Sequence, residues 1–361
     1  MIQPLKRQIF AFYEWLPWKL PRPSRASYSG LVGCGRFARA AYLAALNTPG
    51  CPVVCSGLVS RSLASAKAFQ RRLWYQAAVY PSWDEFCASG IRSVIIALPN
   101  HLHAEYVEKA LEKGLDVLCE KPLVNSLGEA MRVRTILQKS GRILMTAFNR
   151  RFQESMRKIE DILKEGRVGT VREVRACHNQ DIGNVLLESD WLCDQSKSGG
   201  GVLHHAGVHL LNVMLYLFGE VDRVSATFQN LKLPDLLGED TAECEISFCS
   251  GVRGILKASY ANAFPSGYER LEIEGDRGIL YYHSHDDGLR IRSGAGAEEW
   301  IDCRTTATKE SVLEMLKHFS KCVDKKLLPE TDLEDSVRTL RVSEACKISA
   351  REKRVVLIRE I

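Results

Sequence analysis

The chain lacks a long hydrophobic run. No segment of its 361 residues reaches the roughly 20 apolar residues that a membrane span requires. Lysine and arginine form no long cluster, and a net charge of +5 is small for this length, so composition gives no support for a nucleic-acid partner. Repeats and low-complexity linkers are also missing. These absences favour a globular protein with no membrane span and with enough residues for two domains.

Cysteine pairs of the CxxC type are absent, although the chain contains 12 cysteines. Several, such as Cys119 and Cys249, stand in apolar, strand-like runs. This pattern predicts buried free thiols in a reducing compartment, and we expect a cytoplasmic protein. The aromatic N-terminus is no convincing signal peptide, because Glu14 and Pro17 interrupt its apolar run. Residues 1–27 are expected to form a packed arm of unknown role, with an interfacial membrane anchor as the alternative.

A glycine-rich turn joins the strand-like residues 28–32 to a helical run over 38–46. It fits the pattern G-x-G-x-x-A. The first glycine allows a tight turn, the second lets the backbone approach a pyrophosphate, and the small Ala38 lets strand and helix pack closely. The turn predicts a dinucleotide site, with a simple packing turn as the alternative. Its expected cofactor contacts are Gly33, Gly35, Arg36, Phe37 and Ala38.

Acidic residues are absent between Gly35 and Trp83. An NAD-binding domain usually carries an aspartate or glutamate after its second strand, here residues 53–59, to accept from the ribose hydroxyls. This chain has Ser60 and Arg61 there instead. A serine hydroxyl and the planar fork of an arginine suit a 2′-phosphate. The sequence therefore predicts that NADP is the cofactor, with NAD less favoured.

Strand-like and helical runs alternate through the first 150 residues. Further strands are expected at 93–98, 116–120 and 143–148, which predicts an α/β fold with a doubly wound parallel sheet. Ligands bind beyond the carboxyl ends of such strands. Residues expected there against the cofactor are Leu98, Pro99, Asn100, His103, Glu120, Lys121 and Asn149. For Asn100 and His103, helix capping or packing is the alternative.

Lys121 follows the strand at 116–120, in the sequence Glu120-Lys121-Pro122. This position puts its ammonium group at a strand's carboxyl end, so we expect Lys121 to face the chemistry. A solvated turn lysine is the alternative.

The pattern changes after residue 152, where successive strand-like runs occur without helices between them. They predict an antiparallel sheet and a domain boundary near residue 150. The expected domains are therefore 28–150 for the dinucleotide and 151–361 for substrate binding and oligomerisation. An amphipathic helix near 332–347 is expected to pack back toward the first domain.

Three glycines at 199–201 precede a segment with three histidines. Glycine lets a backbone come close to a ligand. His205 and His209 are four residues apart and would share a helix face, where His209 could exchange a proton with a substrate hydroxyl or ketone. Satisfied polar groups in a domain interface are the alternative. Such a pair can also bind zinc, but no acidic third ligand stands at a recognisable spacing, so no metal is predicted.

These motifs together resemble the Gfo/Idh/MocA family, named after glucose-fructose oxidoreductase and inositol dehydrogenase. The resemblance runs from about residue 28 to the carboxyl terminus, and it also includes the stretch 149–152. It implies a Rossmann domain joined to an α+β domain with an open, mainly antiparallel sheet. It further implies a nicotinamide cofactor, a sugar-like substrate and a homodimer or homotetramer. Lys121 and His209 match the family's catalytic lysine and histidine, and the bond before Pro122 is often cis in such proteins.

The chain departs from the family pattern at His205, where an aspartate is usual, and at Asn212, where an acidic residue is common. Loss of an anion should make a neighbouring lysine or histidine hold its proton less firmly. His205 is kept as a third candidate catalytic residue. The expected function is an NADP-dependent oxidoreductase that interconverts a secondary alcohol and a ketone on a sugar or cyclitol. The alternatives are a lyase that uses transient oxidation and a non-catalytic NADP-binding protein.

Overall fold

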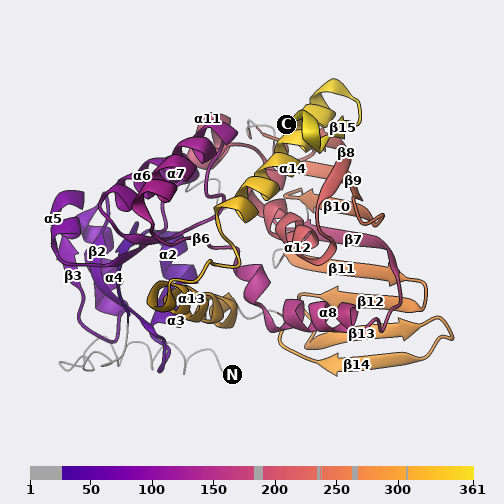
Figure 1. Ribbon diagram of the computed structural model, residues 1–361, viewed down its shortest axis with the longest axis horizontal. Helices are drawn as coiled ribbons and strands as arrows, with labels where there is room; N and C mark the ends of the chain where they lie inside the picture. Colours follow the sequence, from indigo (N-terminus) through magenta and orange to yellow (C-terminus); the bar gives the residue numbers. More distant parts are fainter. Residues whose placement is uncertain (1–26, 183–189, 234–235, 237, 262–266, 306–307) are drawn as a thin grey trace.

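The computed structural model describes residues 27–182, 190–233, 236, 238–261, 267–305 and 308–361. Two sheets lie side by side along its long axis (Figure 1). The expected arm at 1–27 falls outside the described residues, except for Ser27, which opens the first strand. None of the described helices is both long and apolar enough to cross a membrane.

The first sheet has six parallel strands in the order β3-β2-β1-β4-β5-β6. The strands are β1 (Ser27–Val32), β2 (Val53–Val59), β3 (Ala78–Tyr80), β4 (Ser93–Ile96), β5 (Asp116–Cys119) and β6 (Leu144–Thr146). Its helices and short 3-10 turns are α2 (Arg36–Ala41), α3 (Leu43–Leu46), α4 (Leu63–Arg72), α5 (Trp83–Ala88), η1 (Asn100–Leu102), α6 (His103–Glu112), α7 (Leu127–Ser140) and η2 (Asn149–Phe152).

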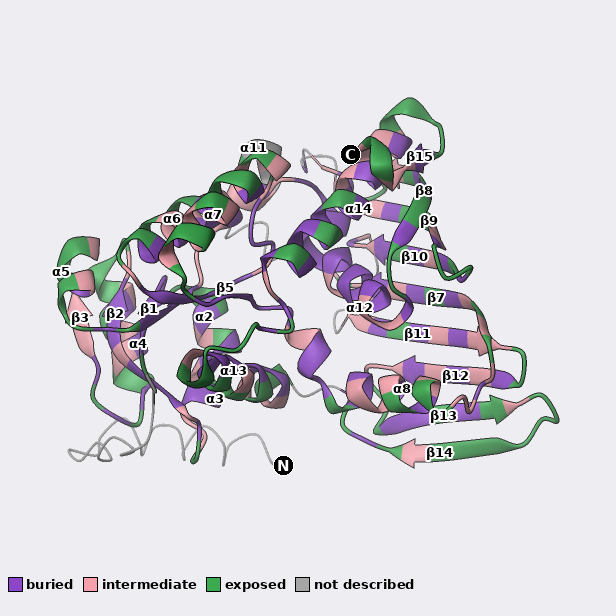
Figure 2. Ribbon diagram, viewed as in Figure 1, coloured by how far each residue is buried: buried purple, intermediate pink, exposed green. Residues whose placement is uncertain are grey.

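Strands β1, β4 and β5 have side chains in the cores on both faces of the first sheet. Their sequences are therefore nearly continuous apolar runs. Leu31 packs with Ile95 and Leu118 on one face, beside α2, α3 and α4. Val94 and Ile96 pack on the other face, beside α5, α6 and α7. The central strands accordingly lie within the protein in Figure 2.

The second sheet has nine strands in the order β14-β13-β12-β11-β7-β10-β9-β8-β15. Neighbours pair antiparallel except β7 and β10, which are parallel. The strands are β7 (Val171–Asn179), β8 (Val221–Gln229), β9 (Thr241–Phe248), β10 (Arg253–Ser259), β11 (Tyr268–Gly275), β12 (Gly278–His283), β13 (Gly288–Ser293), β14 (Glu298–Asp302) and β15 (Val356–Leu357). The remaining elements are α8 (Glu154–Lys164), α10 (Asp190–Cys193), α11 (Gln195–Ser198), η3 (Leu203–Gly207), α12 (Val208–Phe218), α13 (Thr308–Lys325), α14 (Leu333–Glu352) and η4 (Ile358–Glu360).

One face of the second sheet forms a core, because apolar and polar residues alternate along its strands. In β9, Cys244 and Ile246 are buried against this core while Glu243 and Glu245 are exposed. Helices α8, α12 and the second half of α14 cover the inner face (Figures 1 and 2). The outer face carries cross-strand ion pairs, such as Lys257 with Glu243 at 3.0 Å.

Two helices beyond residue 151 reach the first sheet. The apolar side of α13, including Met315 and Phe319, packs into the same core as Leu31. Helix α14 contributes Leu333 and Val337 to the core on the opposite face, and its later residues join the core of the second sheet. The second stretch of the chain therefore contributes two helices to the layers around the first sheet.

Cysteine burial agrees only partly with the sequence. All the cysteines whose side chains are described are free, and Cys119 is buried in β5 as expected. The expectation of burial was wrong for Cys249, which is exposed. Strand β9 ends one residue earlier at Phe248, so Cys249 stands in the turn toward β10.

Candidate active site

The residues predicted to contact the cofactor lie at or just beyond the carboxyl ends of the parallel strands. The glycine-rich turn follows β1, Ser60 and Arg61 follow β2, and Leu98 and Pro99 follow β4. Asn100 opens η1, His103 opens α6, Glu120 and Lys121 follow β5, and Asn149 opens η2. Neighbouring strands are parallel, so these residues share one edge of the sheet.

The glycine-rich turn has the geometry that a bound dinucleotide requires. Gly33 has a φ of +91°, and a Cβ there would lie 2.3 Å from the carbonyl oxygen of Ala97, so a side chain would be excluded. A Cβ at Gly35 would meet no atom within 4 Å, which leaves open space beside the backbone. Ala38 is fully buried against the core, whereas Phe37 and Arg36 are exposed. The turn therefore fits a pyrophosphate over Gly35.

The end of β2 lies beside this turn. The backbone N–H of Cys34 donates to the Ser60 hydroxyl at 3.5 Å, and Arg61 is exposed. Ser62 caps α4 by accepting from the N–H of Ser65. Arg61 thus lies in solvent directly after Ser60, which contacts the glycine-rich turn.

Lys121 is directed toward the second sheet's half of the molecule. Its ammonium donates to the backbone carbonyl of His205, 84 residues away in the chain. Burial lowers the pKa of Lys121 to about 8, Arg150 lowers it as well, and Glu120 and Glu269 oppose this effect. The peptide bond to Pro122 is cis. Lys121 can therefore exchange a proton near neutral pH.

Glu120 lies behind the lysine and is tied to the cofactor half. Its carboxylate accepts from the hydroxyl of Tyr42 at 2.6 Å and from the backbone N–H of Lys121 at 3.3 Å. Burial raises the pKa of Glu120 to about 7, although the contacts with Tyr42 and Lys121 lower it. The charge of Glu120 therefore acts on the pKa of Lys121.

Three other predicted cofactor residues have protein partners. The ring nitrogens of His103 lie 2.7 Å from the carbonyl oxygen of Pro122 and 2.8 Å from that of Leu98, so His103 holds two loops together. The side-chain amide of Asn100 donates to the carbonyl of Ser198 at 3.0 Å. The amide of Asn149 donates to the Ser311 hydroxyl at 3.1 Å. All three side chains therefore make polar contacts within the protein.

The histidine segment is not a regular α-helix. Residues Leu203–Gly207 form a π-helical turn before α12 begins at Val208, and this wider turn changes the relation between His205 and His209. His205 is 8% exposed, and its Nδ1 lies 3.5 Å from the amide nitrogen of Asn100. His204 is buried too, with Nε2 3.3 Å from the side-chain oxygen of Asn125. Both histidines therefore face the first domain.

His205 and His209 are neutral groups in this site. Burial lowers the pKa of His205 to about 3, and the charges of Lys121 and Lys347 lower it further. Burial also lowers the pKa of His209 well below its usual value, with added effects from Lys121 and Arg150. Among the described residues, neither Nε2 of His205 nor Nδ1 of His209 has a hydrogen-bond partner. Both atoms are buried polar groups that no described residue pairs with.

The glycines at 199–201 serve packing of the protein itself. Gly199 has a φ of +82°, and a Cβ on Gly201 would lie 2.1 Å from the backbone oxygen of Glu239. The N–H of Val202 donates to that same oxygen at 2.8 Å. The close approach predicted from these glycines is therefore made to the protein backbone.

Sequence reasoning assigned no role to an ion-pair cluster beside Lys121 and His209. Arg150 donates from Nε to both carboxylate oxygens of Glu269, at 3.1 and 2.9 Å. His178 Nδ1 lies 3.2 Å from the same carboxylate. Burial would raise the pKa of Glu269, but Arg150 and His178 lower it to about 2. A signal for this cluster was present in the strands themselves, because His178 in β7 and Glu269 in β11 stand at the same alternating positions as the buried apolar residues of their strands. The two residues lie opposite one another in the sheet.

Asn212 points to α14. Its amide donates to Asp335 Oδ2 at 2.8 Å and to the Thr339 hydroxyl at 3.1 Å. Asp335 also pairs with Arg151 at 3.1 Å, and both side chains are buried. Asn212 thus belongs to a network that joins α12, η2 and α14.

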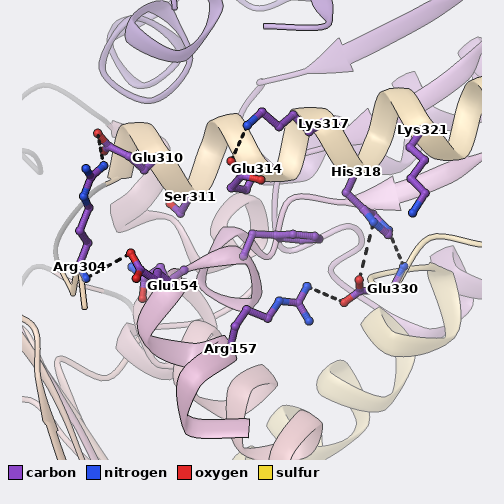
Figure 3. Close-up of a pocket in the computed structure, with 12 residues that line it drawn as sticks. Glu154, Arg157, Arg304, Glu310, Ser311, Glu314, Lys317, His318, Lys321 and Glu330 are labelled. Carbon is purple, nitrogen blue, oxygen red and sulfur yellow. Dashed lines mark hydrogen bonds and ion pairs between the residues drawn. The ribbon is translucent and has the colours of Figure 1, made fainter. Parts of the chain in front are cut away.

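A separate cleft lies away from these residues. It has a volume of about 580 Å³ between α13 and α8. Several of its charged groups are paired, such as Arg157 with Glu330 and Lys317 with Glu314, both at 2.7 Å (Figure 3). No predicted site residue lines it. Among the described residues, no cluster of three or more histidine, cysteine or acidic side chains could hold a metal ion.

Comparison with protein families agrees with this arrangement. The family described as oxidoreductase with an NAD-binding Rossmann fold matches residues 28–148, and the GFO/IDH/MocA C-terminal domain matches residues 156–281. The chain belongs to the Gfo/Idh/MocA family. The resemblance inferred from the separated motifs is therefore confirmed.

Relatives of this Gfo/Idh/MocA protein include sugar and polyol dehydrogenases. It is 27% identical to D-apiose dehydrogenase of Paraburkholderia graminis over 347 residues, which cover 92% of this chain and 89% of that protein. It is 26% identical to myo-inositol 2-dehydrogenase of Thermotoga maritima over 280 residues, covering 75% and 81%. The chain is therefore a member of a sugar and polyol oxidoreductase family with an NAD-binding fold.

A solved structure of the same architecture is an oxidoreductase from Agrobacterium radiobacter in complex with NAD⁺, L-tartaric acid and magnesium. Its TM-score is 0.80 at 21% identity, and the match covers 92% of this chain and 98% of the other. The likeness and the two sheets confirm the predicted fold class, a Rossmann doubly wound sheet followed by an α+β domain with a mainly antiparallel sheet.

Proposed function

We propose that the protein is an NADP-dependent oxidoreductase that interconverts a secondary alcohol and a ketone on a sugar-like substrate. The observation that carries this proposal is Lys121, a half-buried lysine whose pKa is lowered to about 8, at the edge where the glycine-rich turn fits a pyrophosphate. The named sugar and polyol dehydrogenases among its relatives support the substrate class.

The chain's own residues handle the proton. When bound, NADP⁺ supplies the acceptor for the hydride that leaves the carbinol carbon. In the neutral form, Lys121 takes the proton of the substrate hydroxyl, and in the charged form it returns a proton to the ketone oxygen. His209, neutral because burial lowers its pKa, hydrogen-bonds the same oxygen through a ring nitrogen. His205 helps to shape the pocket beside them.

The catalytic roles are tested by Lys121→Ala and His209→Ala. Each variant should lose about 10²-fold or more in turnover, because general acid–base groups contribute on that order. NADPH affinity, measured by fluorescence titration, should change far less than turnover. Full activity in both variants would refute these roles. A panel of ketosugars, aldoses and cyclitols, assayed with each cofactor, serves as the substrate screen.

NADP preference rests on Arg61 and Ser60 after β2, and on the lack of an acidic residue between Gly35 and Trp83. Arg61→Ala should raise the Kd for NADPH by about tenfold or more, as expected from the loss of a charge-assisted hydrogen bond, and leave the Kd for NADH nearly constant. Arg72→Ala, at the far end of α4, is the matched control. A wild-type protein that binds NADH more tightly than NADPH would contradict this preference.

A non-catalytic NADP-binding protein is the second candidate function. The neutral His205 beside Lys121 favours it, because no carboxylate occupies that position. Turnover of any sugar or cyclitol at a useful rate would exclude this candidate.

We also propose a cytoplasmic homodimer or homotetramer. The free cysteines support a reducing compartment, and the exposed outer face of the second sheet is available for association. Light scattering of the purified protein measures the assembly, and a monomer at micromolar concentration would contradict it.

A further inference from the structure

The candidate site has cationic hydrogen-bond donors, but its carboxylate acceptors already have partners. Two carboxylates act on Lys121, those of Glu120 and Glu269. Glu120 accepts from Tyr42 and from backbone, and Glu269 accepts from Arg150 beside His178. Both carboxylates are buried and already engaged. Both carboxylates are therefore largely shielded from the hydroxyl groups of a neutral sugar.

Arg150 is only partly used by its carboxylate partner. It reaches Glu269 through Nε alone, and within the described part of the chain its two Nη groups have no hydrogen-bond partner. Its side chain is 22% exposed, so the fork is open on one side. The two Nη groups of arginine can hold an anionic oxygen group by two parallel hydrogen bonds.

Two neighbouring imidazoles add polar ring nitrogens beside Lys121. His205 is more than nine-tenths buried, and its Nε2 has no partner within the described residues, as is also true of Nδ1 of His209. Burial and nearby cations keep both rings neutral by lowering their pKa values. A neutral ring can donate to an oxygen, and it does not repel an anion as a carboxylate would.

We propose that this site selects substrates with an anionic oxygen group, namely sugar acids or hydroxy acids, which Arg150 binds through its free Nη groups. His205 is then a specificity-determining residue, because a neutral imidazole admits the anion. This inference rests on the proposed oxidoreductase function for its reaction. Arg150 and His205 together determine whether acidic or neutral substrates are preferred. Carboxylate and phosphate groups both carry the anionic oxygens that Arg150 would bind.

Matched substrates test the proposal on the full-length protein. Gluconate is compared with glucitol, galacturonate with galactose, and glucose 6-phosphate with glucose, each with NADP⁺ and NAD⁺. The acid should have a kcat/KM about 10- to 100-fold above its neutral counterpart, the range expected for hydrogen bonds to a charged group. A higher kcat/KM for gluconate or galacturonate indicates a carboxylate site, and a higher kcat/KM for glucose 6-phosphate indicates a phosphate site. Equal or higher kcat/KM for the neutral members would overturn the proposal.

Three variants locate the preference. His205→Asp should lower the ratio of kcat/KM for the acid to kcat/KM for its neutral partner at least tenfold, whereas His205→Asn should retain this ratio. Arg150→Lys keeps a charge beside Glu269 but loses the planar fork, so it should raise KM for the acid alone. Thermal melting verifies that each variant folds. An unchanged acid-to-neutral ratio in both His205→Asp and Arg150→Lys would refute the assignment.

Binding separates this inference from the proposed function. Calorimetry of the NADP⁺-saturated protein measures affinity for gluconate, glucose 6-phosphate and their neutral partners without any need for turnover. Preferential binding of an acid without oxidation by either cofactor would support the anion site and refute the oxidoreductase. Oxidation of neutral sugars alone would support the oxidoreductase and refute the anion site. No preferential binding of any acid would overturn the anion site.

Discussion

Replacing Glu120 by glutamine should move the pH dependence of catalysis to lower pH. The pKa of Lys121 falls from 10.5 to about 8, and at about 1.4 kcal/mol per pH unit this is a penalty of roughly 3 kcal/mol on the charged form. Burial is the main cause, and Glu120 opposes it. The pKa of Glu120 is about 7, so most of its negative charge is present when Lys121 titrates.

The magnitude follows from removing that charge. An opposite charge nearby typically moves a pKa by about 1–3 units, so Glu120→Gln should lower the pKa of Lys121 from about 8 to about 7 or below. In the oxidation direction, kcat/KM rises with pH as Lys121 becomes the neutral proton acceptor. The midpoint of this rise should therefore fall by about one pH unit or more.

The assay is kcat/KM for alcohol oxidation from pH 5.5 to 10, normalised to the plateau of each protein. Reduction of the ketone should show the opposite slope with the same midpoint, because it needs the charged lysine. Glu112→Gln, an exposed change on α6, is the control and should leave the midpoint in place. An unchanged or higher midpoint in Glu120→Gln would refute the electrostatic link to Lys121.

Two further predictions concern stability. Asp335→Ala leaves the buried Arg151 without its carboxylate partner, so the free energy of unfolding measured in urea should fall by about 3–5 kcal/mol. Glu334→Ala removes an exposed carboxylate and should change this free energy little. Equal effects of the two substitutions would contradict the buried ion pair. Glu269 has its pKa lowered from 4.5 to about 2, so it contributes roughly 3 kcal/mol above pH 4.5, which is lost as the pH falls toward 2. In Glu269→Gln this pH-dependent part of the urea stability should disappear, and an unchanged profile would count against the ion pair with Arg150.

Local patterns predicted the first sheet because its strands and its glycine-rich turn are specified by residues close together in the chain. Strand β2 has the predicted bounds Val53–Val59, and its apolar run is buried on both sides. Gly33 needed a positive φ, which few other residues tolerate, and the structure gives it +91°. The edge that carries Lys121 followed from strand direction alone. These features depend on residues close together in the chain.

The remaining features depend on partners far apart in the chain. Arg150 and Glu269 are separated by 119 residues, and only the folded sheet brings them together. The π-helical turn at Leu203–Gly207 has no composition of its own that marks it within an apolar, histidine-rich run. Helix α13 shows a regular apolar face, but periodicity does not state which sheet that face covers. Contacts of this kind require the tertiary structure.

Tyr42 connects the two parts of the proposed site. It is the C-cap of α2, the helix that follows the glycine-rich turn, and it is fully buried. Its hydroxyl donates to Glu120, which raises the pKa of Lys121 through its charge. Tyr42 and Glu120 therefore form a direct chain of contacts from the helix after the glycine-rich turn to Lys121.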